Sequence, residues 1–197
     1  MKTLRNSILL FYLIVTVNTV FAGDFKGGLL AGFCASQMDG DRLAGYHKFG
    51  PTAGFFINRD IDENWAGQFE IRFDQKGAAY VNGEQSYKAR MNYVELPFMV
   101  NYKIYNKFKA EIGLEPSVLI RSTVLFNQFK TNPKYNSFDL PIAIGGYYTI
   151  SKSLEINIRF SYSLLPVKGN SLSKNIAFYG YNTFNNAFNF VLYYYLR

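Results

Sequence analysis

The sequence predicts an all-β fold, an eight-stranded antiparallel up-and-down transmembrane β-barrel with short periplasmic turns and long extracellular loops. Three observations predict this fold class: an export signal at the N-terminus, apolar and polar side chains that alternate along most segments, and connections that are alternately long and short. Alternation at every second residue is typical of a strand whose two faces meet different surroundings.

Residues 1–22 have the pattern of a secretory signal peptide. Lys2 and Arg5 precede the apolar run "ILLFYLIVTV", and Ala22 supplies the small residue that a signal peptidase reads. An uncleaved anchor is the alternative, but the run is short for a membrane helix. We expect cleavage after Ala22 and one outer-membrane barrel domain over 23–197. Removal of Lys2 and Arg5 lowers the formal net charge from +7 to +5.

The rest of the chain restricts how it crosses a membrane and what chemistry it carries. No later apolar run approaches the ~20 residues that a spanning helix needs, so only a closed β-barrel would cross a bilayer. Cys34 is the single cysteine, which excludes an internal disulfide and a cysteine-based zinc site. We expect no cofactor and no metal. Basic residues alternate with acids instead of forming a stripe, so nucleic acid is not an expected partner.

The first five strands are expected near 25–35, 51–58, 65–76, 91–104 and 107–121. The first is rich in glycine and apolar on both faces, and the second is short. The third, "WAGQFEIRFDQK", sets aromatic and aliphatic side chains against glutamine, glutamate, arginine and aspartate. "NYVELPFMVNYKI" and "KFKAEIGLEPSVLI" alternate in the same way, and a helix would mix their apolar and charged residues on one face.

The last three strands are expected near 137–150, 154–165 and 186–197. "FDLPIAIGGYYTI" and "LEINIRFSYSL" alternate clearly, whereas "NAFNFVLYYYLR" alternates more weakly. The long, polar connections are 36–50, 77–90, 122–136 and 166–185, and they are separated by tight turns such as Tyr105-Asn106. An up-and-down barrel gathers alternate connections at one end, and outer-membrane barrels have long external loops and short periplasmic turns.

The direction of the two faces decides between a membrane barrel and a soluble secreted barrel. The interior of an eight-stranded barrel holds only side chains or one small ligand, and the bulky apolar faces would overfill it. We therefore expect the apolar faces to meet lipid and acids and bases to neutralise one another inside. The expected lumen charge network comprises Glu70, Arg72, Asp74, Glu95, Lys109, Glu111, Glu115, Arg121, Glu155 and Arg159, with Lys103 on the same face.

Aromatic residues and prolines give two further expectations. Aromatics near strand ends are typical of a membrane-interface girdle. The expected girdle residues are Tyr102, Tyr105, Phe108, Tyr147, Tyr148 and Tyr193 to Tyr195. Pro97, Pro116 and Pro141 fall inside expected strands, and proline donates no ladder hydrogen bond, so each should lie at a bulge or near a rim.

Two stretches resemble the paired signature of the PorT-like outer-membrane β-barrel family, a small outer-membrane protein β-barrel domain. In that family Q-x-E-x-x-[YF]-x-x-K-G precedes Y-[LV]-E-[IL]-P-x-x-x-x-Y. The matching residues are Gln68, Glu70, Phe73, Lys76 and Gly77, then Tyr93, Glu95, Leu96, Pro97 and Tyr102. "EIGLEP" resembles the next strand of the family. The resemblance implies a small outer-membrane barrel, and the namesake of the family takes part in protein secretion across that membrane.

The long connections contain one group of residues with catalytic chemistry. His47, the only histidine, lies near Ser36, Asp39 and Asp41, which are the ingredients of a hydrolase or acyltransferase. The spacing matches no nucleophile motif and G-x-S-x-G is absent, so we expect no catalytic residues. A lipid-modifying enzyme is the weakest alternative.

Three functional hypotheses follow from this sequence. The favoured one is a non-enzymatic barrel in the outer membrane, with a structural or surface-interaction role through its extracellular loops. The second is a component of a secretion or assembly apparatus, and the third is a transport pore, which a charge-filled lumen disfavours. The expected partners are outer-membrane lipid and lipopolysaccharide, the barrel assembly machinery and, by the resemblance, secretion-apparatus proteins.

Overall fold

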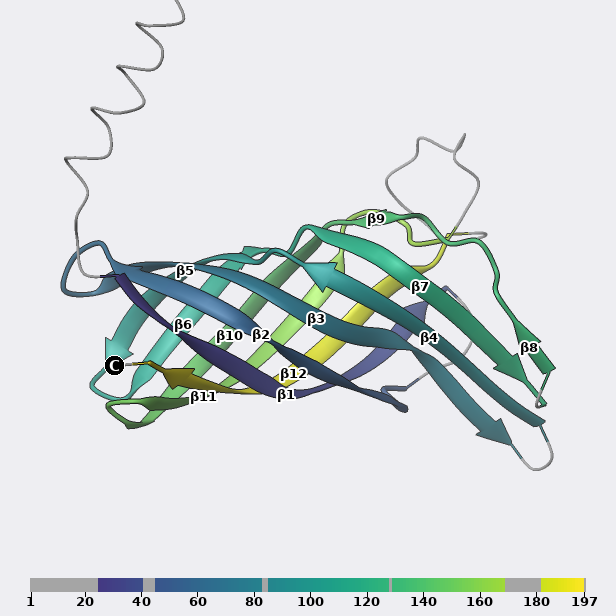
Figure 1. The fold of residues 1–197 in the computed structure, drawn as a ribbon, viewed down its shortest axis with the longest axis horizontal. Helices are drawn as coiled ribbons and strands as arrows, with labels where there is room; N and C mark the ends of the chain where they lie inside the picture. The colour runs from purple at the N-terminus through teal and green to yellow at the C-terminus, as the bar shows by residue number, and fades with distance from the viewer. Residues whose placement is uncertain (1–24, 41–44, 83–84, 128, 169–181, 197) are drawn as a thin grey trace, which may run out of the picture.

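The computed structural model describes residues 25–40, 45–82, 85–127, 129–168 and 182–196. The expected signal peptide and its cleavage site lie outside these residues. Within them the chain is built from β-strands (Figure 1). The strands are β1 (Phe25–Asp39), β2 (Lys48–Asp60), β3 (Trp65–Asn82), β4 (Gln85–Glu95), β5 (Phe98–Tyr105), β6 (Phe108–Leu114), β7 (Ser117–Phe126), β8 (Phe129–Thr131), β9 (Phe138–Asp139), β10 (Pro141–Ser151), β11 (Leu154–Ser163) and β12 (Phe184–Tyr195).

The strands close into a ring of antiparallel neighbours. β1 pairs with β2 on one side and β12 on the other, and β3 pairs with β2. Three wall strands are each interrupted once, so that each consists of two consecutive strands: β4 with β5, β6 with β7, and β9 with β10. β3 pairs with both β4 and β5. In the same way, β4 and β5 pair with β7 and β6, which pair in turn with β9 and β10. The ring therefore has eight wall strands, and the expected up-and-down barrel is confirmed.

Several strands extend farther than the alternation predicts, all at the end with the long connections. β3 and β4 pair as far as Asn82 with Gln85, so the connection expected at 77–90 is itself a two-stranded ribbon. The connection expected at 122–136 contains the end of β7 and the short strand β8. The expectation that these stretches are loops is wrong. Exposed charged residues such as Lys88 and Lys130 occur there together with exposed aromatics such as Phe129, so these stretches lack the clear apolar face that identifies a strand in the sequence.

The three prolines lie side by side in the barrel wall. Pro97 separates β4 from β5, Pro116 separates β6 from β7, and Pro141 follows the break between β9 and β10. Each proline carbonyl still accepts a backbone hydrogen bond, from the amides of Glu70, Leu96 and Glu115, respectively. Regular strand pairing is therefore interrupted at the same height in three adjacent wall strands. This height is within the wall and not at a rim.

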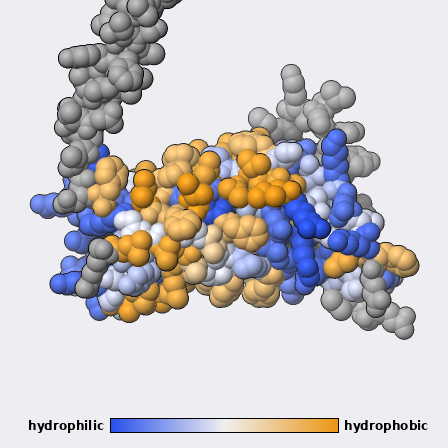
Figure 2. All heavy atoms as spheres, in the orientation of Figure 1, coloured by the Kyte–Doolittle hydropathy of each residue, from blue (hydrophilic) through white to orange (hydrophobic). Residues whose placement is uncertain are grey.

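The outer surface is apolar and the interior is polar. Every wall strand presents exposed apolar side chains outward, and one from each is Phe33, Phe55, Ile71, Phe98, Ile112, Ile144, Ile158 and Leu192. On the face that Figure 2 shows, hydrophobic residues gather over the middle of the barrel and hydrophilic residues gather toward its two ends. A soluble barrel would bury these apolar side chains, whereas lipid solvates them. No helix among the described residues is long and apolar enough to cross a bilayer.

The aromatic girdle is only partly as expected. Tyr102, Tyr105, Phe108, Tyr148 and Tyr194 are exposed on the outer surface. Tyr147 and Tyr193, in contrast, are 2% and 0% exposed and point into the barrel, so their assignment to the girdle is wrong. Tyr195 packs against the same interior cluster. The alternation of each strand, and not the proximity of these tyrosines to a strand end, determines the face on which they lie.

Candidate functional site

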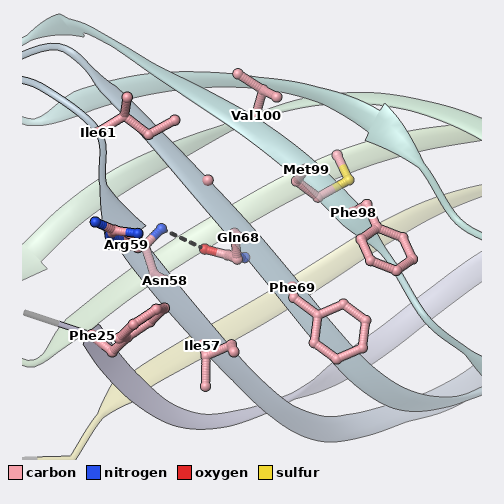
Figure 3. Close-up of a pocket in the computed structure, with 11 residues that line it drawn as sticks. Phe25, Ile57, Asn58, Arg59, Ile61, Gln68, Phe69, Phe98, Met99 and Val100 are labelled. Atoms are coloured by element: carbon pink, nitrogen blue, oxygen red, sulfur yellow. Dashed lines mark hydrogen bonds between the residues drawn. The ribbon is translucent and has the colours of Figure 1, made fainter. Parts of the chain in front are cut away.

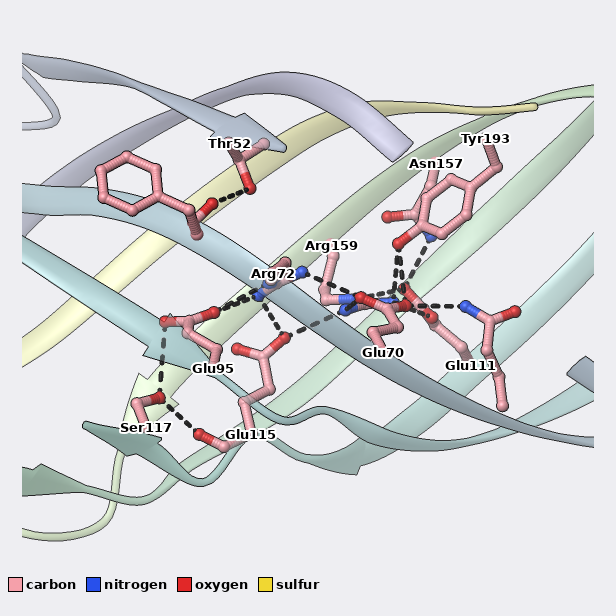
Figure 4. Close-up of polar contacts among 12 residues, drawn as sticks. Thr52, Glu70, Arg72, Glu95, Glu111, Glu115, Ser117, Asn157, Arg159 and Tyr193 are labelled. Atoms are coloured by element: carbon pink, nitrogen blue, oxygen red, sulfur yellow. Dashed lines mark hydrogen bonds and ion pairs between the residues drawn. The ribbon is translucent and has the colours of Figure 1, made fainter. Parts of the chain in front are cut away.

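The most distinctive polar feature of the barrel is a cluster of buried charges in its interior (Figure 4). Arg159 comes from β11, while β3 supplies alternate inward positions at Glu70 and Arg72. Glu95 ends β4, Glu111 lies on β6, and Glu115 lies in the break before Pro116. All six of these charged residues are at most 2% exposed. The wall breaks therefore lie at the height of this charge cluster.

Arg159 is the centre of one half of the cluster. Its Nε and Nη2 donate to the two carboxylate oxygens of Glu111, both at 2.7 Å, in a two-pronged arrangement. Nη2 also lies 2.8 Å from Glu70 Oε1, and Nη1 donates to Glu115 Oε1 at 3.1 Å. Gly145 leaves room for this contact, because a Cβ at that position would lie 2.5 Å from Glu111 Oε1.

Arg72 and Lys76 form the other half of the cluster. Arg72 Nε donates to Glu95 Oε2 at 2.8 Å, and its Nη2 donates to Glu115 Oε1 at 2.7 Å. Lys76 Nζ lies 2.6 Å from the other oxygen of Glu95. Glu115 accepts from both Arg72 and Arg159, so it joins the two halves into one network. Buried charges persist only when they are paired and hydrogen-bonded in this way.

Several neutral side chains complete the network, and the expected set omits them. Tyr193 donates to Glu70 Oε1 at 2.9 Å, and Gln68 Nε2 donates to the same oxygen at 2.7 Å. Asn157 Nδ2 donates to Glu111 Oε1 at 2.7 Å. Lys76, which binds Glu95, is also absent from the expected set. Their inward positions follow from the same strand alternation, which is the signal that would have identified all four.

Other residues of the expected network lie elsewhere. Lys109 and Glu155 pair with each other at 2.6 Å, close to a short turn and apart from the central cluster. Asp74 is buried in the interior but forms no ion pair with a cation that the structure describes. Lys103 pairs with Lys109 at the end of the wall near the short turns, where its side chain is exposed, and it takes no part in the central cluster.

Arg121 is the clearest correction to the expected network. It is exposed on the outer face, although simple alternation from Glu115 places it inside. The cause is a β-bulge: Tyr93 pairs with Leu119 and Asn92 pairs with Arg121, so Ile120 is an extra residue in β7. One inserted residue reverses the alternation beyond it. Val124, accordingly, is buried inside the barrel.

Apolar clusters fill the interior on both sides of the charges. Toward the short turns lie the buried side chains of Leu30, Phe56, Tyr147, Val191 and Tyr193. Toward the long connections lie Met38, Ala78, Ala89, Met91, Tyr93, Val124 and Tyr135. These apolar clusters share the interior with further buried polar side chains, such as Asn185 near Tyr93 and Asn58 near the short turns, in the narrow lumen that an eight-stranded barrel encloses.

A hollow of about 420 Å³ opens on the outer surface near the short turns (Figure 3). Phe25, Ile57, Phe69 and Phe98 line it with apolar surface, and Gly67 leaves it open because a Cβ there would meet only Ile61, at 3.9 Å. The hollow opens on the lipid side of the wall, and its floor includes the buried Asn58 and Gln68, the second of which hydrogen-bonds to Glu70 of the interior cluster. Its apolar lining suits an acyl chain better than a polar substrate.

The residues with catalytic chemistry do not assemble into a site. Ser36 is buried, and its Oγ accepts a hydrogen bond from the Gly77 amide at 2.9 Å. His47 is exposed, and no hydrogen bond joins it to Ser36 or Asp39 within the part of the chain that the structure describes. Asp41 lies outside the described residues. No group of three or more potential metal ligands occurs among the described residues.

The closed ring, the lipid-facing apolar band and the charged interior point to one class of protein. Residues 21–169 match the outer membrane protein beta-barrel domain family. The chain belongs to this family. It is therefore an outer-membrane β-barrel protein. No curated protein sequence matches the chain.

Solved structures of similar fold are other small outer-membrane barrels. The attachment invasion locus protein Ail of Yersinia pestis has a TM-score of 0.53 at 9% identity, over 88% of this chain and 99% of Ail. Ail in complex with the heparin analogue sucrose octasulfate has a TM-score of 0.55 at 10% identity, over the same shares of the two chains. Neisserial surface protein A has a TM-score of 0.54 at 9% identity, over 86% of this chain and 96% of that protein. At these identities the likeness concerns the fold alone.

Proposed function

We propose that this outer-membrane barrel is a non-enzymatic surface-interaction protein, which contacts a partner through a sheet that extends beyond its external rim. β3 has its last β2 partner at Asp74 and continues for eight residues beyond it, to Asn82. In Figure 1, β3, β4, β7 and β8 reach beyond the ends of β1 and β2. Strands that continue past the wall serve no purpose in spanning lipid, which needs ~9–11 residues.

The observation that carries this proposal is a row of aromatic side chains across the extended sheet. Tyr80 pairs with Tyr87, Tyr87 with Phe126, and Phe126 with Phe129, so one aromatic from each of β3, β4, β7 and β8 stands opposite the next. Phe126 and Phe129 are 51% and 78% exposed. Aromatic residues are enriched at protein interfaces, because they bury a large area at small entropic cost.

The sheet also offers an unpaired edge. Among the described strands β8 pairs with β7 alone, so the backbone of Phe129, Lys130 and Thr131 has one free side. A free edge outside the membrane is available for an extended segment of a partner. The aromatic row and the edge adjoin each other at Phe129, which makes this corner of the sheet the centre of the proposed contact surface.

The interior supports a structural role, not a catalytic or transporting one. The charges of the central cluster contact one another and hydrogen-bond to neighbouring strands, and apolar layers cover them on both sides. A substrate or a water-filled pore would need space that these side chains occupy. We infer that the lumen is plugged and that the cluster holds the wall strands in register.

The resemblance to PorT-like barrels leaves a secretion role as the alternative. The residues that carry the resemblance, however, belong to the barrel itself: Gln68 and Glu70 are in the interior network, Lys76 binds Glu95, and Pro97 lies at a wall break. They account for architecture and give no surface for a secretion partner. The extended sheet therefore favours the surface-interaction role.

Site-specific photocrosslinking in intact outer membranes tests the proposed surface. A benzophenone amino acid would replace Phe129 or Tyr80 at the sheet and Tyr105 at the opposite end of the barrel, all three being exposed aromatics. We expect defined crosslinked products from positions 129 and 80 with proteins or glycans outside the cell, and none of these from position 105. A stoichiometric product with envelope secretion proteins from position 105 would instead establish the secretion alternative.

A further inference from the structure

The extended sheet carries a second feature, on the face opposite to its aromatic row. Lys88 and Arg90 of β4, Arg121 of β7 and Lys130 of β8 are exposed on the outward face. The pairing of Asn92 with Arg121 and of Leu125 with both Lys88 and Lys130 brings these cations together across three strands. In Figure 2 strongly hydrophilic residues gather over β4 and β7 beside the hydrophobic residues.

These cations surround a hollow of about 310 Å³. Arg90, Arg121 and Lys130 line it together with the polar side chains of Gln75, Asn92 and Thr123. Gln75 donates to Asn92 Oδ1 at 3.1 Å, which fixes the two amides at one side of the hollow. The site thus combines three positive charges with neutral hydrogen-bonding groups in a concave surface.

No carboxylate neutralises this site within the described part of the chain. The ion pairs of the described residues involve Lys26, Arg72, Lys76, Lys109 and Arg159, and none involves Lys88, Arg90, Arg121 or Lys130. The interior of the barrel, where nearly every cation is paired, shows the opposite arrangement. An exposed cluster of like charges creates a positive potential that attracts a polyanion.

The height of the site relative to the membrane identifies the polyanion. On the outward face Phe73, Val94 and Val118 form one apolar row across β3, β4 and β7. The next outward row along the strands is Gln75, Asn92 and Arg121. One step between outward residues is about 7 Å along a strand, so the cations begin where the apolar band ends. That is the headgroup layer, which adds ~5–8 Å on each side of the hydrocarbon core.

We propose that Arg90, Arg121 and Lys130 form a binding site for the phosphate groups of an outer-leaflet glycolipid, lipopolysaccharide, beside the barrel wall. Guanidinium groups suit this ligand because their parallel N–H donors match the oxygens of a phosphate. The acyl chains of the glycolipid would lie against the apolar row below. The side of the sheet that faces the membrane then holds lipid, and its opposite face stays open to a partner.

The β-bulge at Ile120 is part of the proposed site. Without the extra residue Arg121 would point into the barrel, where the neighbouring interior positions belong to the apolar cluster around Tyr93 and Val124. The bulge places its guanidinium outside, in the same row as Asn92 and one row from Arg90. The proposal depends on the barrel crossing the outer membrane with this end outward, and not on the surface partner proposed above.

Lipid titration of the full mature chain in nanodiscs, followed by native mass spectrometry, tests the site. The probes are diphosphoryl lipid A and the same lipid without phosphates. We expect the wild type to prefer the diphosphoryl form, and the triple variant Arg90→Gln, Arg121→Gln and Lys130→Gln to bind it at least about tenfold more weakly. The phosphate-free lipid should bind equally to both proteins.

A matched control removes the same charge at the other end of the barrel. Lys103, Lys107 and Lys152 are exposed near the short turns, and changing all three to Gln should leave lipid A binding unchanged. Heat-modifiable gel migration establishes that each variant is folded. If the triple variant does not fold, the single variants Arg121→Gln and Lys130→Gln are measured in its place. Equal binding by the triple variant, or equal weakening by the control, would overturn the site. Tighter binding of soluble heparin fragments than of lipid A would overturn the lipid assignment.

Discussion

Arg159 holds together carboxylates from two other parts of the barrel wall. Glu70 comes from β3, and Glu111 and Glu115 come from β6 and the break that follows it. Burying charges is costly, and a well-packed apolar cluster would often be at least as stable. A network of fixed donors and acceptors, however, can form these contacts in only one register of the strands. We therefore interpret the cluster as a device for specifying register.

Replacing Arg159 with Met should destabilise the barrel strongly. The change leaves Glu70 and Glu111 buried beside fewer cations, and breaking a buried ion pair from one side costs ~3–5 kcal/mol. Urea unfolding of the protein refolded into phosphatidylcholine vesicles measures the effect. Lys152→Met, at an exposed position, is the control and should change stability little. A variant as stable as the wild type would show that the cluster contributes nothing to the folded state.

The two adjacent glycines of β10 should respond differently to the same substitution. In Gly145→Ala the new Cβ would lie 2.5 Å from Glu111 Oε1 and 2.6 Å from the Ile158 carbonyl oxygen. Gly146 faces outward, and a Cβ there would meet only the Lys109 carbonyl oxygen, at 3.3 Å. Overpacking of this kind costs ~1–3 kcal/mol. The same unfolding assay should show Gly145→Ala to be the less stable variant, and the reverse order would contradict the interior geometry.

Most interior charges could be predicted from the sequence at this scale, because alternation alone assigns a side chain to one face. Glu70, Arg72 and Glu111 are examples. The partners that each charge selects could not be predicted, since they depend on the pairing of strands distant in the chain. The composition of the C-terminal strand predicts Tyr193 at the membrane interface, because tyrosine suits that layer, but its position in the strand directs its hydroxyl to Glu70.

At the scale of the elements, the bulge divides β7 into two parts, and the inward and outward alternation of side chains is reversed between them. Before it, Ser117 points inward and Val118 outward; after it, Val124 points inward and Arg121 outward. A bulge leaves little trace in a single sequence, because each half of the strand alternates regularly. This is why Arg121 could not be placed correctly from the sequence.

Cysteine labelling would detect this reversal. Arg121→Cys should react with a membrane-impermeant maleimide on intact cells, whereas Val124→Cys should not, because Val124 is buried in the interior cluster. The native Cys34 is 0% exposed and should stay unlabelled, so the wild type is the blank. Labelling of position 124 with protection of position 121 would mean that the strand runs without a bulge.

The ends of the strands were the least predictable part of the elements. The alternation of apolar and polar residues is strong where one face meets lipid and fades where both faces meet water. β3 and β4 continue past that point with Ala79, Tyr80 and Lys88 in place of a clear apolar face. Hydrogen bonding across the ribbon, which a single sequence does not display, maintains the strands there.

At the scale of the whole molecule, the barrel is a closed ring of strands around buried interior side chains. Its class could be predicted from the sequence because three independent patterns agree: the expected export signal, the alternation of apolar and polar residues, and the alternation of long and short connections. What the sequence did not reveal is the asymmetry of the external end, where four strands extend and the others stop. That asymmetry gives the barrel two external faces with different chemistry.

The filled interior should make the protein electrically silent. In planar lipid bilayers the purified barrel should give no single-channel conductance, because the side chains of the charge cluster and of the apolar clusters on its two sides are buried in the interior. An unrelated porin reconstituted in the same bilayers serves as the positive control. Discrete, reproducible conductance steps from the folded barrel would revive a transport role and contradict the packing described above.

The aligned prolines give one side of the cylinder a seam. At that height three neighbouring strands include residues without an amide hydrogen, while the other five wall strands run through unbroken. This side of the wall alone therefore has a part toward the long connections and a part toward the short turns. The charge cluster behind the seam links these two parts. Glu95 lies on the side of the long connections, Glu111 lies on the side of the short turns, and Glu115 lies in the break between them. Deformation of the barrel should therefore concentrate at the seam, on the side of the three interrupted strands, and should increase there when the charge network is weakened.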